Sequence, residues 1–312
     1  MKIIVTGGAG FIASHIVDAY LKAGHKVVVI DDLSYGFRRN LNPQAKFYKA
    51  DIGDRKSMDK IFRTERPDVV NHHAARASVI ESVRDPAATI NTNLMGTLNL
   101  LLAFGKYGPA SAKASAGKGG KFIFASTGGA IYGSPQKLPA GENTPQNLLS
   151  PYALSKALGE ELIRFYAAQF KFPYLLLRYA NVYGPRQNPK GEAGVVAIFS
   201  GLIKHNRRPV VFGDGSKTRD YVHVDDVMRA NVLGLGRGKN ECINIGLGRE
   251  ISDEKVFRTV AGALGFKKEA IYARFRTGEV RRISLDARRA RRVLGWKPKI
   301  KFEEGIRRTV NF

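Results

Sequence analysis

The chain contains little sulfur and lacks long apolar runs. Its 312 residues include one cysteine, Cys242, so no disulfide can form within the chain, and this composition is typical of the reducing cytoplasm, where we expect the protein to act. No apolar run approaches the roughly 18 residues that span a bilayer. The first residues, MKIIVTGGAG, have too short an apolar stretch for a secretory signal. We therefore expect a globular protein with no membrane partner.

Acidic side chains are also scarce, which leaves a net charge of +24. Between Lys267 and Arg308 there are fifteen basic residues and five acidic ones. Such a field attracts polyanions, but it also suits phosphorylated small substrates, and runs such as DARRARRVLGW usually form the solvated face of a helix. With no helix-turn-helix spacing, zinc knuckle or RNP-type strand, we expect no nucleic-acid partner.

Apolar runs alternate with helical spacing through the first half of the chain. Strands are predicted at KIIVT, KVVVIDD, KFYKAD, PDVVNHHAA, GKFIFAST and FPYLLLRYANVYG, with helical segments between them. Repeated βα units imply an α/β fold with a doubly wound parallel sheet of the Rossmann type. Frequent Gly and Pro after this region predict a smaller, mixed portion. We expect the sheet domain over 1–184, with a strand returning near 241–246, and a ligand-binding portion over 185–312.

A glycine turn joins the first predicted strand to the first helix. Gly7, Gly10 and Ala13 form G-x-x-G-x-x-A, and residues without bulk let backbone N–H groups and the helix N-terminus meet a pyrophosphate. Asp31 ends the second strand, 21 residues beyond Gly10. A carboxylate at that place accepts hydrogen bonds from the ribose hydroxyls of NAD and repels a 2′-phosphate. These residues predict NAD as the cofactor.

Two further features bear on the cofactor. Arg38 and Arg39 could hold the 2′-phosphate of NADP, but they lie several residues past the end of the second strand. Asp51, which closes the third strand, suits the adenine amine and equally suits an ordinary strand-end turn. NAD remains the favoured cofactor, and a binding role for Asp51 remains open.

The segment SPYALSKALGEEL places Tyr152 and Lys156 four residues apart, on one face of a helix. A phenol with a pKa near 10 is a poor base at neutral pH, so it needs a nearby ammonium and a cationic nicotinamide to stabilise the phenolate. Ser126 or Thr127, at the end of the preceding strand, would hydrogen-bond the substrate oxygen. The sequence does not decide between these two hydroxyls. In isolation, the tyrosine–lysine pair is also compatible with an ordinary surface helix.

Five stretches carry a resemblance to a known family. They are MKIIVTGGAGFIASH, STGGAIYG, SPYALSKALGE, LRYANVYGPRQNPKGEAGVVAIF and RDYVHVDDV. Together they resemble the UDP-glucose 4-epimerases of the extended short-chain dehydrogenase/reductase superfamily. The resemblance implies an NAD-dependent isomerase that interconverts UDP-galactose and UDP-glucose through a 4-keto sugar, and a homodimer paired through helices near 92–106 and 151–169. The chain departs from the family at Ala13, usually a glycine, and in a basic loop within 107–121.

The residues after Thr127 favour epimerisation over elimination. Related sugar 4,6-dehydratases resemble S-T-D-E-V-Y-G and use the acidic pair for elimination. Gly128 and Gly129 occupy those two positions here, so no carboxylate is available. The alternatives are a UDP-glucuronate 4-epimerase or decarboxylase, a UDP-N-acetylglucosamine 4-epimerase, or a non-catalytic relative that binds NAD or RNA.

The resemblance also implies roles for individual residues. It brings Arg76 to the NAD pyrophosphate and Asn93 behind the nicotinamide. Arg219 and Arg276 would grip the substrate diphosphate, which suits the geometry of a guanidinium. Glu279 stands where the family usually has an aspartate on the uridine ribose. The other implied positions are Phe11, Ile12, Asp32, Ile52, Ala74, Ala75 and Tyr179 for the cofactor, Asn181 for the diphosphate, and Gly194, Val195, Val196 and Phe212 for the uracil.

Two groups of residues contain side chains of the kind that bind metals. His72 and His73 are adjacent on a strand, so they point to opposite faces and cannot chelate together. His223, Asp225 and Asp226 fit a strand that runs into an N-capped helix. We therefore predict no metal site.

Overall fold

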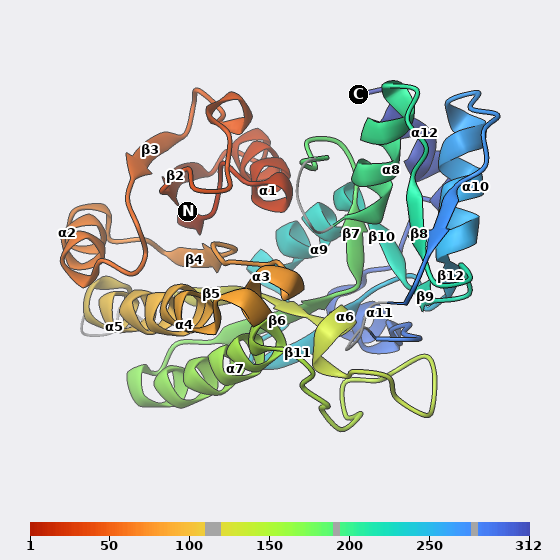
Figure 1. Cartoon of the computed structure of the whole chain (residues 1–312). Coiled ribbons are helices and arrows are strands. Elements are labelled where there is room, and N and C mark those ends of the chain that lie inside the picture. The colour runs from red at the N-terminus through yellow and green to blue at the C-terminus, as the bar shows by residue number, and fades with distance from the viewer. Residues whose placement is uncertain (110–119, 190–193, 276–279) are drawn as a thin grey trace. The chain divides into compact units, whose positions relative to one another are not determined.

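The computed structural model describes residues 1–109, 120–189, 194–275 and 280–312 (Figure 1). These residues form two compact units that are interleaved along the chain. Unit 1 comprises Met1–Ser126, Ser150–Leu177 and Met228–Ile243, and unit 2 comprises Thr127–Leu149, Arg178–Val227 and Asn244–Phe312. The expected division into a sheet domain over 1–184, with a strand returning near 241–246, and a ligand-binding portion over 185–312 stays a prediction.

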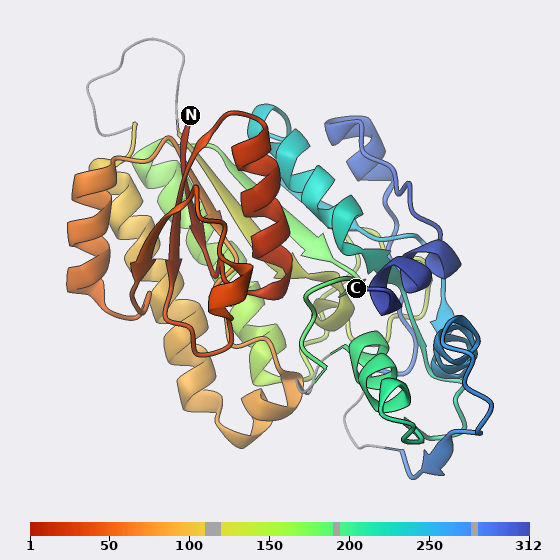
Figure 2. The ribbon, with the colours of Figure 1, turned by 90° about the horizontal axis from the view of Figure 1, so that it is seen from above.

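Unit 1 holds most of a seven-stranded sheet with the order β11-β6-β5-β4-β1-β2-β3 (Figure 2). The pairs β1–β2, β1–β4, β2–β3 and β4–β5 are parallel, and the predicted Rossmann-type α/β fold is confirmed. The strand order reverses between β1 and β4, and sheets of this kind bind ligands at the carboxyl ends beside such a reversal. The strands are β1 (Lys2–Thr6), β2 (Lys26–Asp31), β3 (Lys46–Lys49), β4 (Val69–His72), β5 (Lys121–Thr127), β6 (Tyr174–Tyr179) and β11 (Glu241–Ile245).

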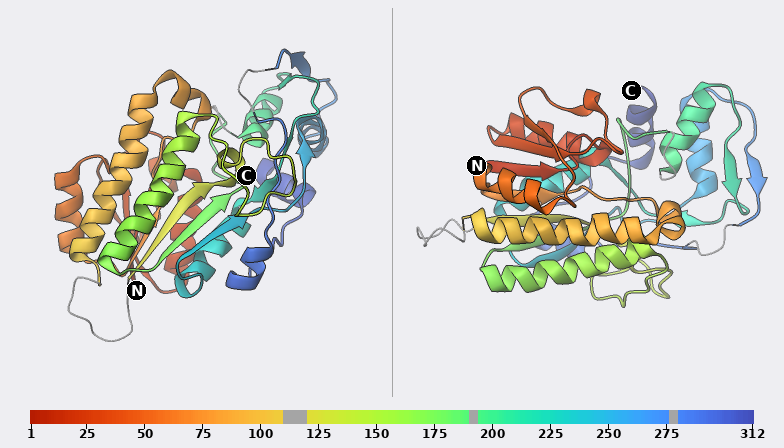
Figure 3. Two further views of the ribbon diagram at one scale, coloured as in Figure 1. Left: turned by 90° about the horizontal axis from the view of Figure 1, so that it is seen from below. Right: turned by 60° about the vertical axis from the view of Figure 1, so that its left-hand side comes forward.

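Helices cover both faces of this sheet (Figures 2 and 3). On one face α2 (Arg55–Glu65), α5 (Gly96–Tyr107) and α7 (Pro151–Phe170) share a core that includes Phe62, Phe104 and Phe122. On the other face lie α1 (Phe11–Lys22) and α9 (Val224–Gly236), where Asn71 donates to the hydroxyl of Tyr20 and to Asn231 Oδ1. The remaining short helices are η1 (Arg38–Asn40), α3 (Val79–Arg84), α4 (Pro86–Ile90) and η2 (Asn91–Met95).

The amino end of the sheet carries a buried lysine and a glycine turn. Lys121, the first residue of β5, donates from Nζ to the carbonyl oxygen of Gly234 at 2.6 Å and to that of Arg237. It thus satisfies carbonyl groups at the end of α9, as a cation at a helix C-terminus does. Gly24, with φ 78°, turns the chain from α1 into β2, and a Cβ at this position would meet no atom within 4 Å.

The segment FPYLLLRYANVYG forms two strands instead of the single strand predicted from its apolar run. β6 ends at Tyr179, and β7 (Asn181–Tyr183) follows after one residue. The N–H of Ala180 donates to Ile245 O at 2.9 Å, whereas the N–H of Asn181 donates to Asp220 O at 2.9 Å. The chain therefore changes its pairing partner at residue 180.

Within its described residues, unit 2 contains three two-stranded sheets and five helices that lie wholly in it. β7 pairs with β10 (Tyr221–His223) and β8 (Val210–Phe212) with β13 (Ile271–Ala273), both parallel, and β9 (Thr218–Arg219) pairs antiparallel with β12 (Ile251–Ser252). The helices are α6 (Gly128–Ile131), α8 (Val195–Lys204), α10 (Asp253–Ala263), α11 (Arg288–Leu294) and α12 (Phe302–Val310). Tyr183, Phe199, Phe257 and Phe302 belong to its apolar core.

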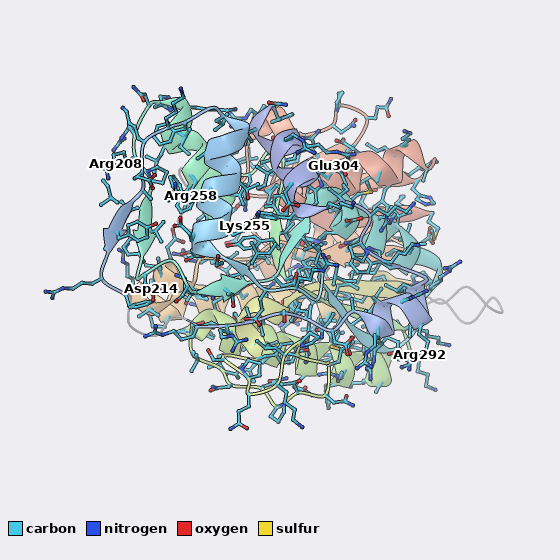
Figure 4. The ribbon with its side chains drawn as sticks, turned by 90° about the vertical axis from the view of Figure 1, so that its right-hand side faces the viewer. Arg208, Asp214, Lys255, Arg258, Arg292 and Glu304 are labelled. Carbon is cyan, nitrogen blue, oxygen red and sulfur yellow. The ribbon has the colours of Figure 1, made fainter. Side chains whose placement is uncertain are left out.

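Part of the basic surface of unit 2 is paired with acidic side chains. Arg258 on α10 forms ion pairs with Glu254 and Glu269, and Arg308 pairs with Glu304 (Figure 4 labels Arg258 and Glu304). Exposed pairs of this kind contribute little to stability individually. Among the described residues, no helix combines the length and apolar character needed to cross a bilayer.

Candidate active site

The glycine turn lies between β1 and α1 in unit 1. Gly7 has φ 70°, and a Cβ at this position would lie 2.7 Å from the backbone nitrogen of Ala74. Gly10 is the N-cap of α1 and supplies no side-chain acceptor to the first N–H groups of the helix. The first N–H groups of α1 have no side-chain cap, and the turn before them carries no side-chain bulk at Gly7 and Gly10. Such a helix start suits a phosphate group.

Three predicted carboxylates hold turns at the carboxyl edge of the sheet. Asp31 accepts from the N–H of Ala9 at 3.0 Å and from that of Leu33 at 2.8 Å, and so ties the glycine turn to β2. Burial raises the pKa of Asp31, while these two hydrogen bonds act in the opposite direction. Asp32 and Asp51 are exposed, and each accepts the backbone N–H two residues ahead. Each carboxylate retains lone pairs for a ligand.

The other predicted cofactor residues differ in exposure. Ile52 is buried and packs against α5, where a Cβ on Gly96 would lie 2.5 Å from Ile52 Cδ1. Its side chain therefore belongs to the core of unit 1, and only its backbone can face a ligand. Tyr179, at the end of β6, is buried in unit 2. In unit 1, half-buried predicted cofactor residues include Phe11, Ile12, Ala74 and Ala75.

Asn93 connects the segment after β4 to α7. Its Oδ1 accepts from the N–H of Arg76 at 2.8 Å, and its Nδ2 donates to Arg76 O at 3.1 Å and to Ser155 Oγ at 2.9 Å. The Nε of Arg76 is buried and has no hydrogen-bond partner among the described residues. A buried cationic donor without an acceptor is rare in proteins and suits an anionic ligand. The residues around the glycine turn thus fit a dinucleotide.

The predicted catalytic helix is α7, capped by the Ser150 side chain, which accepts the N–H of Ala153 at 3.1 Å. Tyr152 in its first turn is half-buried. Lys156 is 4% exposed, and its Nζ donates to Ala125 O at 2.8 Å. Burial lowers the pKa of Lys156 to about 7, while the charge of Glu160 acts in the opposite direction. The Lys156 amine is thus buried and held against the end of β5, one helical turn from the phenol.

The two candidate hydroxyls at the end of β5 make different contacts. Ser126 Oγ donates to Glu160 Oε1 at 2.6 Å, so its proton is already engaged. Thr127 Oγ1 accepts the N–H of Ala130 at 3.2 Å as the N-cap of α6, a contact that uses its oxygen and leaves the hydroxyl proton for a further bond. These contacts favour Thr127 as the donor to a substrate oxygen.

The two glycines after Thr127 are closely surrounded within unit 2. A Cβ at Gly128 would overlap the side chain of Leu285, which is fully buried. A Cβ at Gly129 would lie 3.1 Å from Oδ1 of Asn181. An acidic side chain at either position would displace these neighbours.

The histidine pair at the end of β4 is held in its neutral form. His72 hydrogen-bonds Thr6 Oγ1 through Nδ1 at 2.7 Å and Thr97 Oγ1 through Nε2 at 2.9 Å. Burial, together with the charge of Lys156, lowers the pKa of His72 well below its usual value and that of His73 to about 3. Both ring nitrogens of His72 are thus committed to threonine hydroxyls.

The predicted substrate residues described by the structure belong to unit 2. Asn181 in β7 and Arg219 in β9 are half-buried, and Arg219 donates from NH1 to Thr218 O at 2.8 Å. Phe212, at the end of β8, is also half-buried. Arg276 and Glu279 lie outside the described residues, as does most of the basic loop.

The predicted uracil segment forms the start of α8. Gly194 is its N-cap, with φ 104°, and a Cβ there would overlap Gln187. Val195 is half-buried, whereas Val196 is 1% exposed and packs in the core of unit 2. Only the backbone of Val196 can therefore face a ligand.

A family model described as "NAD dependent epimerase/dehydratase family" matches residues 3–246. The chain belongs to this family. The UDP-glucose 4-epimerase of Thermotoga maritima, solved with UDP-glucose, is 47% identical with a TM-score of 0.94, and the match covers 100% of this chain and 98% of that one. The Thermus thermophilus UDP-glucose 4-epimerase, in complex with NAD, is 41% identical with a TM-score of 0.92 over 100% and 98% of the two chains.

A third similar structure has a different named substrate. The UDP-N-acetylglucosamine 4-epimerase from Methanobrevibacter ruminantium M1, in complex with UDP-N-acetylmuramic acid, is 33% identical with a TM-score of 0.90 over 99% of this chain and 97% of that one. The solved structures that resemble this chain are thus named for more than one UDP-sugar.

Two residues that anchor this family member's α7 were not predicted from the sequence. Ser155 Oγ accepts a hydrogen bond from the amide of Asn93, and Glu160 Oε1 accepts one from the hydroxyl of Ser126. Glu160 follows Lys156 by four residues, so the spacing that grouped Tyr152 with Lys156 could have extended to it. Ser155 has no comparable pattern in the sequence.

Proposed function

We propose that this protein is an NAD-dependent epimerase that interconverts UDP-galactose and UDP-glucose by inverting C4 of the sugar. The observation that supports it most strongly is the buried Lys156 one helical turn from the half-buried Tyr152 on α7. Lys156 donates to Ala125 O of β5, the strand that ends in the hydroxyl pair Ser126 and Thr127 and is followed by two glycines. The glycines leave no carboxylate at the two positions that a related dehydratase would use for elimination. As the single cysteine suggested, we place this reaction in the reducing cytoplasm.

NAD would be held by the glycine turn at Gly7 and Gly10, by Asp31 at the end of β2, and by the unpaired Nε of Arg76. These groups offer a phosphate cradle, a ribose acceptor and a buried guanidinium N–H without a hydrogen-bond acceptor among the described residues. When bound, NAD supplies the hydride acceptor that allows C4 to pass through a ketone. Asn93 fixes the backbone at Arg76 and so orients this side of the cofactor site.

The side chains of this chain control the proton at the C4 hydroxyl. Tyr152 acts as a phenolate that removes this proton and returns it after the 4-keto sugar has turned over. Lys156, held by Ala125 O, stabilises the phenolate through its charge. Thr127 donates a hydrogen bond to the reacting oxygen, and Ser126 assists by holding Glu160.

The UDP group would be held by residues of unit 2. Asn181 and the arginines Arg219 and Arg276 suit the diphosphate, because a guanidinium matches phosphate oxygens. Gly194, Val195, Val196 and Phe212 would surround the uracil, with Val196 taking part through its backbone. Glu279 would accept from the uridine ribose.

We also propose that the protein is a homodimer paired through the helices near 92–106 and 151–169, the second of which is α7. Leu154, Leu158 and Phe165 are 40%, 39% and 64% exposed at positions that share one face of α7. α3 packs against α7 and exposes Val79 and Val83. An exposed apolar strip of this kind is typical of a contact between subunits. Sedimentation of the purified protein would test this state.

Proton NMR of the purified protein with UDP-galactose, and no added cofactor, tests the proposed function. We expect conversion to UDP-glucose, because the cofactor is regenerated in each cycle and stays bound. Parallel samples with UDP-glucuronate and UDP-N-acetylgalactosamine test the alternative substrates. Turnover of one of these alone would reassign the sugar, and no turnover of any of them with NAD supplied would contradict an epimerase role.

A further inference from the structure

The face of α7 that carries Tyr152 and Lys156 continues into a buried carboxylate. Residues four apart on a helix share one face, so Tyr152, Lys156, Glu160 and Arg164 follow one another along α7. Lys156 is 4% exposed and Glu160 is fully buried, whereas the side chain of Arg164 is 31% exposed. A phenol, an ammonium, a carboxylate and a guanidinium thus alternate along this face.

Both oxygens of Glu160 have partners on neighbouring elements. Oε1 accepts from Ser126 Oγ of β5 at 2.6 Å, and Oε2 accepts from Arg164 NH2 at 3.2 Å. The thiol of Cys242 in β11 lies 4.0 Å from Oε2. Burying a carboxylate is costly, and an apolar side chain would fill the same space without that cost. What a carboxylate adds at this place is its charge.

The groups around Lys156 explain why a charge is useful there. β5 contributes Ala125 O and the ring of Phe124, whose centroid lies 4.6 Å from Nζ. β4 contributes His72, and His73 follows it; both are neutral because burial lowers their pKa values. From α7 come the phenol of Tyr152 one turn before and Glu160 one turn after. Among the described residues, Glu160 is the group whose charge favours the ammonium form of Lys156.

We propose that Glu160 is a positioning residue of the epimerase, whose buried carboxylate keeps Lys156 in its ammonium form and holds the Ser126 hydroxyl at the end of β5. It acts through Lys156 and does not touch the substrate. Without its charge, the proton of the ammonium passes to the phenolate, which leaves a phenol and a neutral amine. That pair cannot take the proton of a C4 hydroxyl. The inference rests on the roles proposed above for Tyr152 and Lys156.

Glu160→Gln is the direct test, because glutamine keeps the size of the side chain and the acceptor for Ser126 but removes the charge. The phenolate of Tyr152 is followed by its near-ultraviolet absorbance in the holoenzyme without UDP-sugar, as a difference from the same protein carrying Tyr152→Phe. We expect the phenolate to form about one pH unit higher than in the wild type. At pH 7, kcat should fall roughly tenfold while KM changes less than about threefold.

Two matched variants separate charge from structure. Glu160→Asp keeps the charge, and we expect its phenolate to form at the wild-type pH. Glu65 on α2 is a second buried carboxylate, bound to Lys46 Nζ and to the hydroxyl of Tyr48, both at 2.6 Å. Glu65→Gln should lower stability without moving the titration of Tyr152.

An unchanged titration in Glu160→Gln, or an equal shift in Glu65→Gln, would overturn the proposal. If Glu160→Gln does not fold, Arg164→Gln replaces it. This change removes a positive charge beside Glu160, so the Glu160 carboxylate favours the ammonium form of Lys156 more strongly. The phenolate of Tyr152 should then form at lower pH, and any other result overturns the proposal. The titration uses no UDP-sugar. A shift without any epimerisation would therefore support the role of Glu160 and contradict the proposed function.

Discussion

Lys121 at the start of β5 and Lys156 beside the end of the same strand are both buried, and burial lowers the pKa of both, to about 8 and about 7. Both donate to backbone carbonyl oxygens. At the amino end, however, Lys121 meets the last carbonyls of α9. At the carboxyl end, Lys156 stands one helical turn from a phenol on one side and from a buried carboxylate on the other.

The difference shows that burial and a lowered pKa do not identify a catalytic lysine. Lys121 has a sufficient structural reason, since it satisfies carbonyl groups that a helix end leaves without partners. Lys156 has a phenol one helical turn away on α7 and lies at the edge of the sheet where α/β folds bind ligands. The four predictions below compare changes at these two ends, from the largest expected effect on activity to the smallest.

Tyr152→Phe should have the largest effect. Loss of the phenolate removes the base for the C4 hydroxyl, so kcat should fall roughly 10³-fold or more while NAD stays bound. Tyr174→Phe, at the first residue of β6 and hence at the amino end, should change kcat less than about twofold. Steady-state kinetics with UDP-galactose measures both. Comparable losses would mean that the position of the phenol is irrelevant.

Lys156→Met should reduce kcat roughly 10²- to 10³-fold, because the phenolate loses its neighbouring charge. Lys121→Met should leave kcat within about threefold and lower the free energy of unfolding by about 1–3 kcal/mol, since two carbonyl groups lose their donor. Kinetics and urea denaturation together test the pair. A loss of activity in folded Lys121→Met would contradict the structural role of that lysine.

Two glycines with positive φ extend the comparison. Gly7→Ala, at the carboxyl end, introduces a Cβ 2.7 Å from the backbone nitrogen of Ala74. NAD should therefore no longer stay bound to this variant through purification. Gly24→Ala at the amino end meets no neighbour, and its cost should be limited to about 1 kcal/mol of backbone strain. NAD released by denaturation, measured per chain, distinguishes them. If both variants retained equal amounts of NAD, the glycine turn would not be part of the cofactor site.

The last prediction concerns the pH dependence of stability and involves no change in activity. The folded pKa of Lys121, about 8, lies below the value of about 10.5 for the unfolded chain. Between these values the unfolded chain binds a proton that the folded chain does not, so the free energy of unfolding rises with pH, by up to about 3 kcal/mol from this residue. In Lys121→Met, the free energy of unfolding should rise less between pH 8 and 10, by about that amount. Urea denaturation at several pH values measures this. If the free energy of unfolding depended on pH equally in the wild type and in Lys121→Met, Lys121 would not be desolvated.

The sequence was sufficient for the features that depend on local pattern. β1, β2 and β5 follow continuous apolar runs, and the pairing of Tyr152 with Lys156 follows from helical spacing. The break at Ala180 was missed because it depends on pairing with Ile245 and Asp220, which are distant along the chain. Burial of the Ile52 and Val196 side chains depends on tertiary packing in the same way.

The neighbours of Gly128 also restrict how this protein could change its chemistry. Leu285 fills the space that a side chain at position 128 would need, and Oδ1 of Asn181 borders position 129. An acidic residue at 128 would therefore be harmful until Leu285 had first become smaller. The order of substitutions from isomerisation to elimination is thus constrained, and the first step carries a loss of stability with no new activity to compensate.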